Sequence, residues 1–164
     1  MIIAGIDPGL SGAIALLPIN CDGPRLVTVF DMPTFELERN GKKKRELDCA
    51  GIAAIFTTAT IDEVWLEQVG PMPKQGVSSV FSFGGSYWAM RMAATMALKP
   101  LYLVTPQVWK KALRVPAAKD GARARASSLM PYAAKNWPLV KHDGRAEAAL
   151  IAYYGAQQKT QELW

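Results

Sequence analysis

The chain has 164 residues, a net charge of +5 and a hydrophobic content of 50%. This length suits a single domain over residues 1–164 and is too short for two full lobes with a cleft between them. The hydrophobic content excludes wholesale disorder, and no apolar run reaches the roughly 18 residues that would predict a membrane-spanning helix.

The N-terminus and the cysteines favour a cytoplasmic protein. Asp7 follows a short apolar run with no basic leader before it, which argues against a signal peptide. Cys21 and Cys49 are the only cysteines, and two are too few for a disulfide framework or a zinc site. We therefore expect two reduced thiols.

Five short segments are predicted to be strands, because each is apolar or β-branched and is bounded by turn residues. They are residues 2–7, 12–18, 25–32, 63–67 and 100–104. The first three follow one another closely, which favours an antiparallel meander. The polar residues after the third strand, 33–47, are expected to form a loop or a hairpin tip outside the core.

Helical spacing of apolar residues predicts five helices. They are residues 48–60 with Asp48 as N-cap, 78–98, 105–113, a basic helix over 119–130, and a last helix from 143 past 154. Gly84 and Gly85 in the second helix predict close packing or a break. Three strands, helix, strand, helix, strand and further helices predict an α/β fold, a mixed five-stranded sheet flanked by helices.

Four acids lie where an apolar segment meets a loop. Asp7 ends the first predicted strand, Glu67 ends the fourth, and Asp143 and Glu147 begin the last helix. An i,i+4 pair is offset by only about 40° around a helix, so Asp143 and Glu147 can point the same way. Strand ends in α/β sheets are also where functional side chains emerge beside one another.

A cluster of carboxylates repels itself unless a cation neutralises it, and oxygen ligands suit Mg²⁺ or Mn²⁺. Two such ions about 3.5–4 Å apart can activate a water and stabilise the leaving oxygen in phosphodiester cleavage.

Each acid also has a structural explanation. Asp7 precedes Pro-Gly and could be a turn former, and Asp143 and Glu147 could each stabilise a helix N-terminus by about 0.3–1 kcal/mol. The structural explanation is weakest for Glu67, because an acid behind a buried strand is costly without a partner. His142 could be a helix-entry residue, or an outer metal ligand or proton carrier.

Positive charge is concentrated in one part of the chain. Residues 68–142 contain eleven lysines and arginines against one acid, Asp120. Such a distribution is typical of proteins that bind a polyanion, although a solvated surface would also have it.

Four segments, in this order, resemble the motifs of RuvC Holliday junction resolvases. Residues 5–12 (GIDPGLSG) resemble the opening motif, and residues 64–69 (VWLEQV) the second acidic motif. Residues 105–111 (TPQVWKK) resemble the lysine-bearing segment, with Lys119 at a second basic position. Residues 143–152 (DGRAEAALIA) resemble the C-terminal acidic helix in the form found in phage and prophage proteins. The resemblance spans nearly the whole chain.

This resemblance implies an RNase H-like homodimer that nicks branched DNA, in a bacterial cytoplasm or a phage-infected host cell. The substrate would be a four-way junction, or a three-way or flap structure, and the cofactor two Mg²⁺ or Mn²⁺ ions per active site. The ligands would be Asp7, Glu67, Asp143 and Glu147, with His142 as a candidate outer ligand. Lys110 or Lys111, together with Lys119, would hold the scissile phosphate or offset charge in the transition state.

Basic side chains are expected to dominate DNA affinity and to make it sensitive to salt. The predicted contacts are Lys74, Lys110, Lys111, Lys119, Arg123 and Arg125. Lys119 and Arg123 would share one face of the basic helix. Residues 42–45 could touch a distal DNA arm or form a plain exposed loop, and residues 81–96 have enough apolar surface for a core face and a dimer face.

Two features depart from the bacterial pattern. Asp143 and Glu147 are four residues apart, where that pattern has two aspartates three apart, and Glu147 aligns better through the alanine-rich run after it. Gly70 stands where that pattern has an aromatic residue that wedges into the junction. Met72 or Val77 would then have to open the junction here.

Two other functions fit parts of the sequence. A non-catalytic branched-DNA-binding protein of the same fold would use the basic residues without the acids. An actin-like or sugar-kinase-like ATP-binding domain also has an acid and glycines in its opening strand, but it needs two lobes and a second phosphate loop. The presence of all four acids favours the nuclease.

Overall fold

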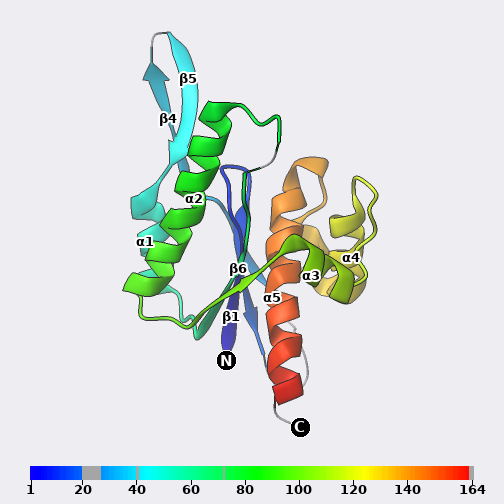
Figure 1. The fold of residues 1–164 in the computed structure, drawn as a ribbon. Coiled ribbons are helices and arrows are strands. Elements are labelled where there is room, and N and C mark those ends of the chain that lie inside the picture. The colour runs from blue at the N-terminus through cyan, green and yellow to red at the C-terminus, as the bar shows by residue number, and fades with distance from the viewer. Residues whose placement is uncertain (20–26, 40, 72, 163–164) are drawn as a thin grey trace.

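The computed structural model describes residues 1–164 except residues 20–26, 40, 72 and 163–164. Five strands form one mixed sheet in the order β3-β2-β1-β6-β7 (Figure 1). Their bounds are Ile2–Asp7 for β1, Ala13–Pro18 for β2, Thr28–Asp31 for β3, Glu63–Glu67 for β6 and Leu101–Val104 for β7. The predicted α/β fold with a mixed five-stranded sheet is confirmed.

The strand directions bring two of the predicted acids to the same edge of the sheet. β1, β2 and β3 form the predicted antiparallel meander, whereas β6 and β7 run parallel to β1. Ile6 is paired with Leu66, so Asp7 and Glu67, one residue further on, end neighbouring parallel strands. Their backbones therefore lie side by side at the carboxyl edge.

Helices cover both faces of the sheet (Figure 1). Helices α1 (Cys49–Thr58) and α2 (Val77–Met96) cover one face. Helix α5 (Asp143–Glu162) covers the other, with α3 (Pro106–Ala112) and α4 (Gly121–Leu129) beside it. Short 3-10 turns at Pro131–Asn136 and Val140–His142 connect α4 to α5 and were not predicted.

The alternation of side chains along β1 and β6 determines the face of the sheet to which Asp7 and Glu67 point. Ile6 and Leu66 belong to the core beneath α1 and α2, whereas Trp65 belongs to the core beneath α5. Because successive side chains of a strand point to opposite faces, Asp7 and Glu67 point to the α5 side.

Glycines let α5 lie against β1. A Cβ atom on Gly5 would overlap the backbone of Ala148 and Ala152. A Cβ atom on Gly144, in the first turn of α5, would lie 2.9 Å from Oδ2 of Asp7. The start of α5 is therefore in contact with the end of β1.

Residues 33–47 were predicted to form a loop or a hairpin tip, and the structure shows a hairpin. They include β4 (Thr34–Arg39) and β5 (Lys42–Leu47), which pair only with each other and project beyond the main sheet and α2 (Figure 1). The predicted position outside the core was right. The bounds of the hairpin's strands were not predicted. Phe35 and Leu37 alternate with polar residues in β4, but β5 is mostly charged and lacks the apolar alternation that indicates a strand.

Two helix predictions were wrong in detail. α2 runs through Gly84 and Gly85 without a break, and Cβ atoms there would meet open space, so neither glycine marks close packing. α4 begins at Gly121, so Lys119 lies in the preceding loop and does not share a helix face with Arg123. Cys49 is exposed and free, and Cys21 lies outside the described residues.

In the described part of the chain, none of the helices has the length and apolar character needed to cross a membrane.

Candidate active site

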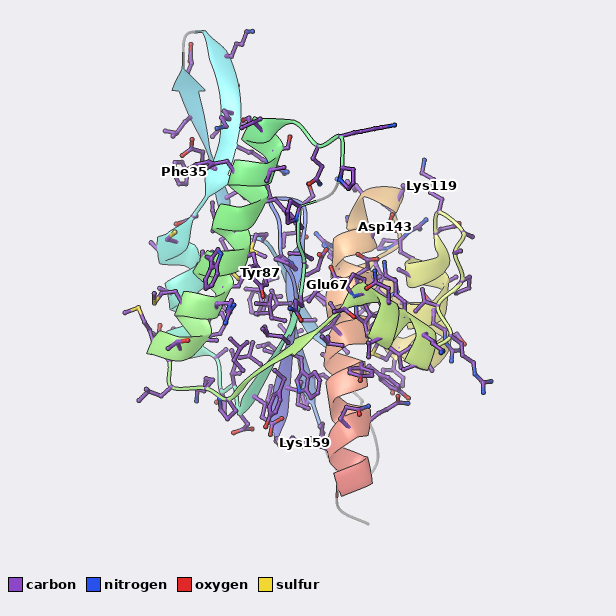
Figure 2. All side chains as sticks on the ribbon, viewed as in Figure 1. Phe35, Glu67, Tyr87, Lys119, Asp143 and Lys159 are labelled. Carbon is purple, nitrogen blue, oxygen red and sulfur yellow. The ribbon has the colours of Figure 1, made fainter. Side chains whose placement is uncertain are left out.

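Three of the four predicted acids come together between the sheet and α5. Asp7 and Glu67 end β1 and β6, and Glu147 lies one turn inside α5. The negative charges of Glu147 and Glu67 both raise the pKa of Asp7, which shows that the three are electrostatic neighbours. In Figure 2, Glu67 lies near the middle of the molecule, Asp143 and Lys119 lie above it, and Lys159 lies below it.

Burial makes these carboxylates expensive to ionise. The pKa of Asp7 lies well above its ordinary value, first because the group is buried and then because of Glu147 and Glu67, while Lys110 acts in the opposite direction. Glu67 is 7% exposed, and burial raises its pKa against the lowering effect of a hydrogen bond from Trp109. A bound cation would relieve both the desolvation and the repulsion.

Trp109 fixes the orientation of Glu67. Its indole Nε1 donates a hydrogen bond to Oε1 of Glu67 at 2.9 Å, and the tryptophan itself is fully buried. A buried indole N–H needs an acceptor, and here that acceptor is a predicted metal ligand. This role was not predicted, although Trp109 directly precedes the predicted lysines in the TPQVWKK segment.

Lys110 is the cation within the acid cluster. Its Nζ donates to Oε1 of Glu147 at 2.7 Å. Burial lowers the pKa of Lys110, but the hydrogen bond to Glu147 and the charges of Glu147, Glu67 and Asp7 outweigh this effect and raise the pKa. Lys111, the alternative, is exposed on α3. The structure therefore distinguishes two lysines that the sequence left equivalent.

Asp143 is paired with an arginine. Nε of Arg123 donates to Oδ1 of Asp143 at 2.8 Å, and Arg123 also lies 3.8 Å from the carboxylate of Asp120. Asp143 and Glu147 line one pocket of about 480 Å³ together with Lys110 and Lys119. Acids and lysines on one wall can receive a phosphate together with its counter-cations.

The donor chemistry suits Mg²⁺ or Mn²⁺, because every ligand would be a carboxylate oxygen. Within the described ranges, no three histidine, cysteine, aspartate or glutamate side chains yet lie close enough to hold one ion. Glu147 is turned to Lys110 and Asp143 to Arg123. The residues fit a divalent ion in charge and donor type, provided that Glu147 releases Lys110 to join Asp7 and Glu67.

The remaining predicted residues lie in different surroundings. His142 lines a separate groove with Asp31 and Arg145, and its Nδ1 accepts a hydrogen bond from the backbone N–H of Leu139 at 3.3 Å. Slight burial and then the charges of Arg145 and Lys141 lower the pKa of His142. This groove, and not the pocket with Glu147, is where the structure places the candidate outer ligand.

Two predicted DNA contacts and one of the two candidate wedges also have defined positions. Arg125 donates from Nε to the carbonyl of Leu113 at 2.5 Å, which ties α4 to the end of α3. Lys74 is exposed in the loop after β6, with a φ of 67°. Val77 is highly exposed at the start of α2, and Met72 lies outside the described residues.

No protein-family model matches the chain, and no curated protein sequence matches it. The chain does match several solved structures. RuvC from Thermus thermophilus, solved with a Holliday junction substrate, has a TM-score of 0.62 at 17% identity, covering 98% of both chains. The fowlpox virus Holliday junction resolvase has a TM-score of 0.56 at 15% identity over 100% of both chains. The yeast mitochondrial Holliday junction resolvase has a TM-score of 0.53 at 16% identity, covering 96% of this chain and 80% of its own. The chain therefore has a RuvC-like fold.

Proposed function

We propose that this protein is a metal-dependent endonuclease that cuts Holliday junctions or other branched DNA. The observation that carries the proposal is the meeting of Asp7, Glu67 and Glu147 from two strand ends and one helix. The similar structures are Holliday junction resolvases, one of them solved with its junction substrate. The fold alone would not support the proposal, since function depends on the site it carries.

The acids would hold two divalent ions, which when bound activate a water and stabilise the leaving oxygen of the phosphodiester. Asp7 and Glu67 are the fixed ligands, because both extend from strand ends and Trp109 orients Glu67. Glu147, and Asp143 after release from Arg123, complete the set. Lys110 and Lys119 line the pocket from which they would bind the oxygens of the scissile phosphate.

The exposed face of α2 supports a dimer. Its apolar residues recur at helical spacing and are 59% to 86% exposed: Val77, Phe81, Trp88, Met92 and Met96. Met90 and Ala94, on another face of α2, are fully buried against the sheet. Exposed apolar stripes of this kind mark interaction sites. A two-fold dimer through α2 would supply the two active sites that two symmetrical nicks require.

Phe81→Glu tests the dimer. A charge in the middle of the apolar stripe should convert a dimer to a monomer in size-exclusion chromatography with light scattering. Val108→Glu, an exposed apolar residue on α3, is the matched control and should leave the oligomeric state unchanged. A wild-type monomer at every concentration that can be measured would contradict the proposed dimer.

Cleavage of four-way, three-way, flap and linear duplex DNA, each with Mg²⁺ and with Mn²⁺, tests the activity. The wild-type protein should nick branched DNA in a metal-dependent way and leave linear duplex intact. Binding of branched DNA without cleavage under either metal would instead establish a non-catalytic junction-binding protein.

A further inference from the structure

The β4–β5 hairpin carries positive charge away from the body of the molecule. β5 has the sequence KKKREL, with four basic residues and one acid, and all four basic residues are exposed. Lys43 lies 3.2 Å from Glu36 and Lys44 lies 3.9 Å from Glu46, both as solvent-exposed pairs. Exposed ion pairs contribute little stability, so both lysines can exchange these partners for a phosphate.

The hairpin and the N-terminal part of α2 form a groove of about 510 Å³. Lys43, Lys44 and Arg45 line one side, and hydroxyls of α2, including Ser79 and Ser82, line the other. Three cations and several hydroxyl donors, without an acid in the lining, are the chemistry that recognises a phosphate backbone. A nucleic-acid strand is the occupant that this charge favours.

This groove borders the loop that follows Asp7, and it shares no lining residue with the pocket of Asp143 and Glu147. Leu10, three residues after Asp7, lies in the lining of the groove. Nη2 of Arg45 donates to Oγ of Ser11 at 2.9 Å, which attaches the hairpin to the loop that follows Asp7. Phe83 also lines the groove, and its ring lies 3.3 Å from where a Cβ atom on Gly9 would be. The hairpin is therefore held against the loop that leaves the first acidic strand, next to the candidate active site in the fold.

The groove lies largely on another side of α2 than the proposed dimer face. At about 100° per residue, Ser79 and Ser82 lie roughly 100° or more around α2 from the centre of the apolar stripe, and Ser78 lies roughly 50° from it. One helix can therefore present Phe81 and Trp88 to a partner subunit and its serines to DNA.

We propose that the β4–β5 hairpin is a second DNA-binding element, which clamps the phosphate backbone of a duplex arm outside the active site. The proposal rests on the proposed function, because its ligand is the branched DNA that the acids would cut. A strand of six residues spans about 20 Å. At about 3.4 Å per base pair, a clamp of this length would cover roughly six base pairs of a duplex arm, which we place next to the crossover.

The decisive experiment measures the affinity for a four-way junction in EDTA, from about 50 to about 200 mM salt. Lys43→Ala/Lys44→Ala is compared with the wild type and with Lys99→Glu. Lys99 lies between α2 and β7 at the opposite edge of the sheet, and replacing it with glutamate changes the net charge by the same two units.

Each phosphate contact contributes about 0.9 to the salt slope, so the double variant should lose about 2 units of slope. Its affinity deficit should then be about tenfold larger at the low salt concentration than at the high one. Lys99→Glu should keep the wild-type slope.

A DNA-side test keeps the proposal falsifiable if the double variant is unstable. Uncharged methylphosphonate linkages placed within roughly six base pairs of the crossover should weaken wild-type binding, whereas the same linkages near the arm ends should not. Equal slopes for wild type and double variant, or no effect of the neutral linkages, would overturn the hairpin proposal and leave the nuclease proposal standing. Failure of the wild-type protein to bind any junction would overturn both. Binding without cleavage would refute the nuclease alone.

Discussion

The two acids that end strands and the two that begin α5 reach the same region in different electrostatic states. Asp7 and Glu67 are surrounded by protein, and burial raises the pKa of both. Glu147 and Asp143 are each bonded to a basic side chain, Lys110 and Arg123. The strand acids thus lack full charge compensation, whereas the helix acids have it. The difference suggests a site in which the sheet fixes two ligands and the helix exchanges its partners when metal and DNA arrive.

Neutralising the strand acids should have the largest effect. Asp7→Asn should lower the rate of junction cleavage about 1,000-fold or more, because it removes a metal ligand while preserving shape. Affinity for the junction in EDTA should not fall, since a negative charge has been removed near phosphate. Single-turnover cleavage together with anisotropy titration measures both. Wild-type cleavage by this variant would refute the metal-ligand assignment.

Lys110→Ala should slow cleavage about 100-fold, since it removes a cation from the site of phosphate charge. Lys111→Ala is the neighbouring substitution, and it should cost at least about tenfold less, because Lys111 is exposed outside the acid cluster. Parallel rate measurements at saturating enzyme test this difference. Equal losses would contradict the assignment of Lys110, and not Lys111, as the lysine that offsets charge on the phosphate.

Trp109→Phe should raise the Mg²⁺ concentration needed for half-maximal cleavage by about tenfold or more, as expected when a residue that orients a ligand is lost. The ring remains to fill the core, but the 2.9 Å hydrogen bond to Glu67 disappears. A Mg²⁺ titration of the cleavage rate separates this effect from simple destabilisation, which would lower the rate at every concentration. An unchanged midpoint would remove Trp109 from the site.

The smallest effect concerns stability without metal. Because the folded-state pKa of Asp7 lies above its ordinary value of 3.8, the folded protein keeps this proton to a higher pH than the unfolded chain does. The associated stability is fully present below pH 3.8 and is lost as the pH rises through the folded-state pKa. Urea unfolding in EDTA should show this decline, and Asp7→Asn should flatten it. Stability that rises over this range in the wild type alone would contradict the assignment.

The sheet and the strand acids could be predicted because the information is local. Apolar runs that end in an acid predicted that β1 and β6 end at Asp7 and Glu67. Parallel pairing then placed both acids at one edge. Helix α5 was predicted to begin at Asp143 for a similar reason, since its apolar residues recur at helical spacing.

The partners of the acids could not be predicted, because they depend on how helices dock. The bond between Trp109 and Glu67 joins residues 42 positions apart and exists only after α3 packs beside α5. Whether Lys110 or Lys111 contacts Glu147 depends on how α3 is rotated about its axis relative to Glu147, and the sequence does not specify this rotation. Arg123 was predicted to contact DNA, and its hydrogen bond to Asp143, 20 positions away, depends on how α4 packs beside α5.

The neck of the β4–β5 hairpin is already closed, since the backbone N–H of Asp48 donates to the carbonyl of Pro33 at 2.9 Å. The two ends of the hairpin therefore lie next to each other, and β4 and β5 pair with no strand of the main sheet. Such a segment can be shortened, lengthened or exchanged during evolution without altering the scaffold that positions the carboxylates. The proposed grip on DNA and the proposed cutting site therefore depend on separate parts of the fold.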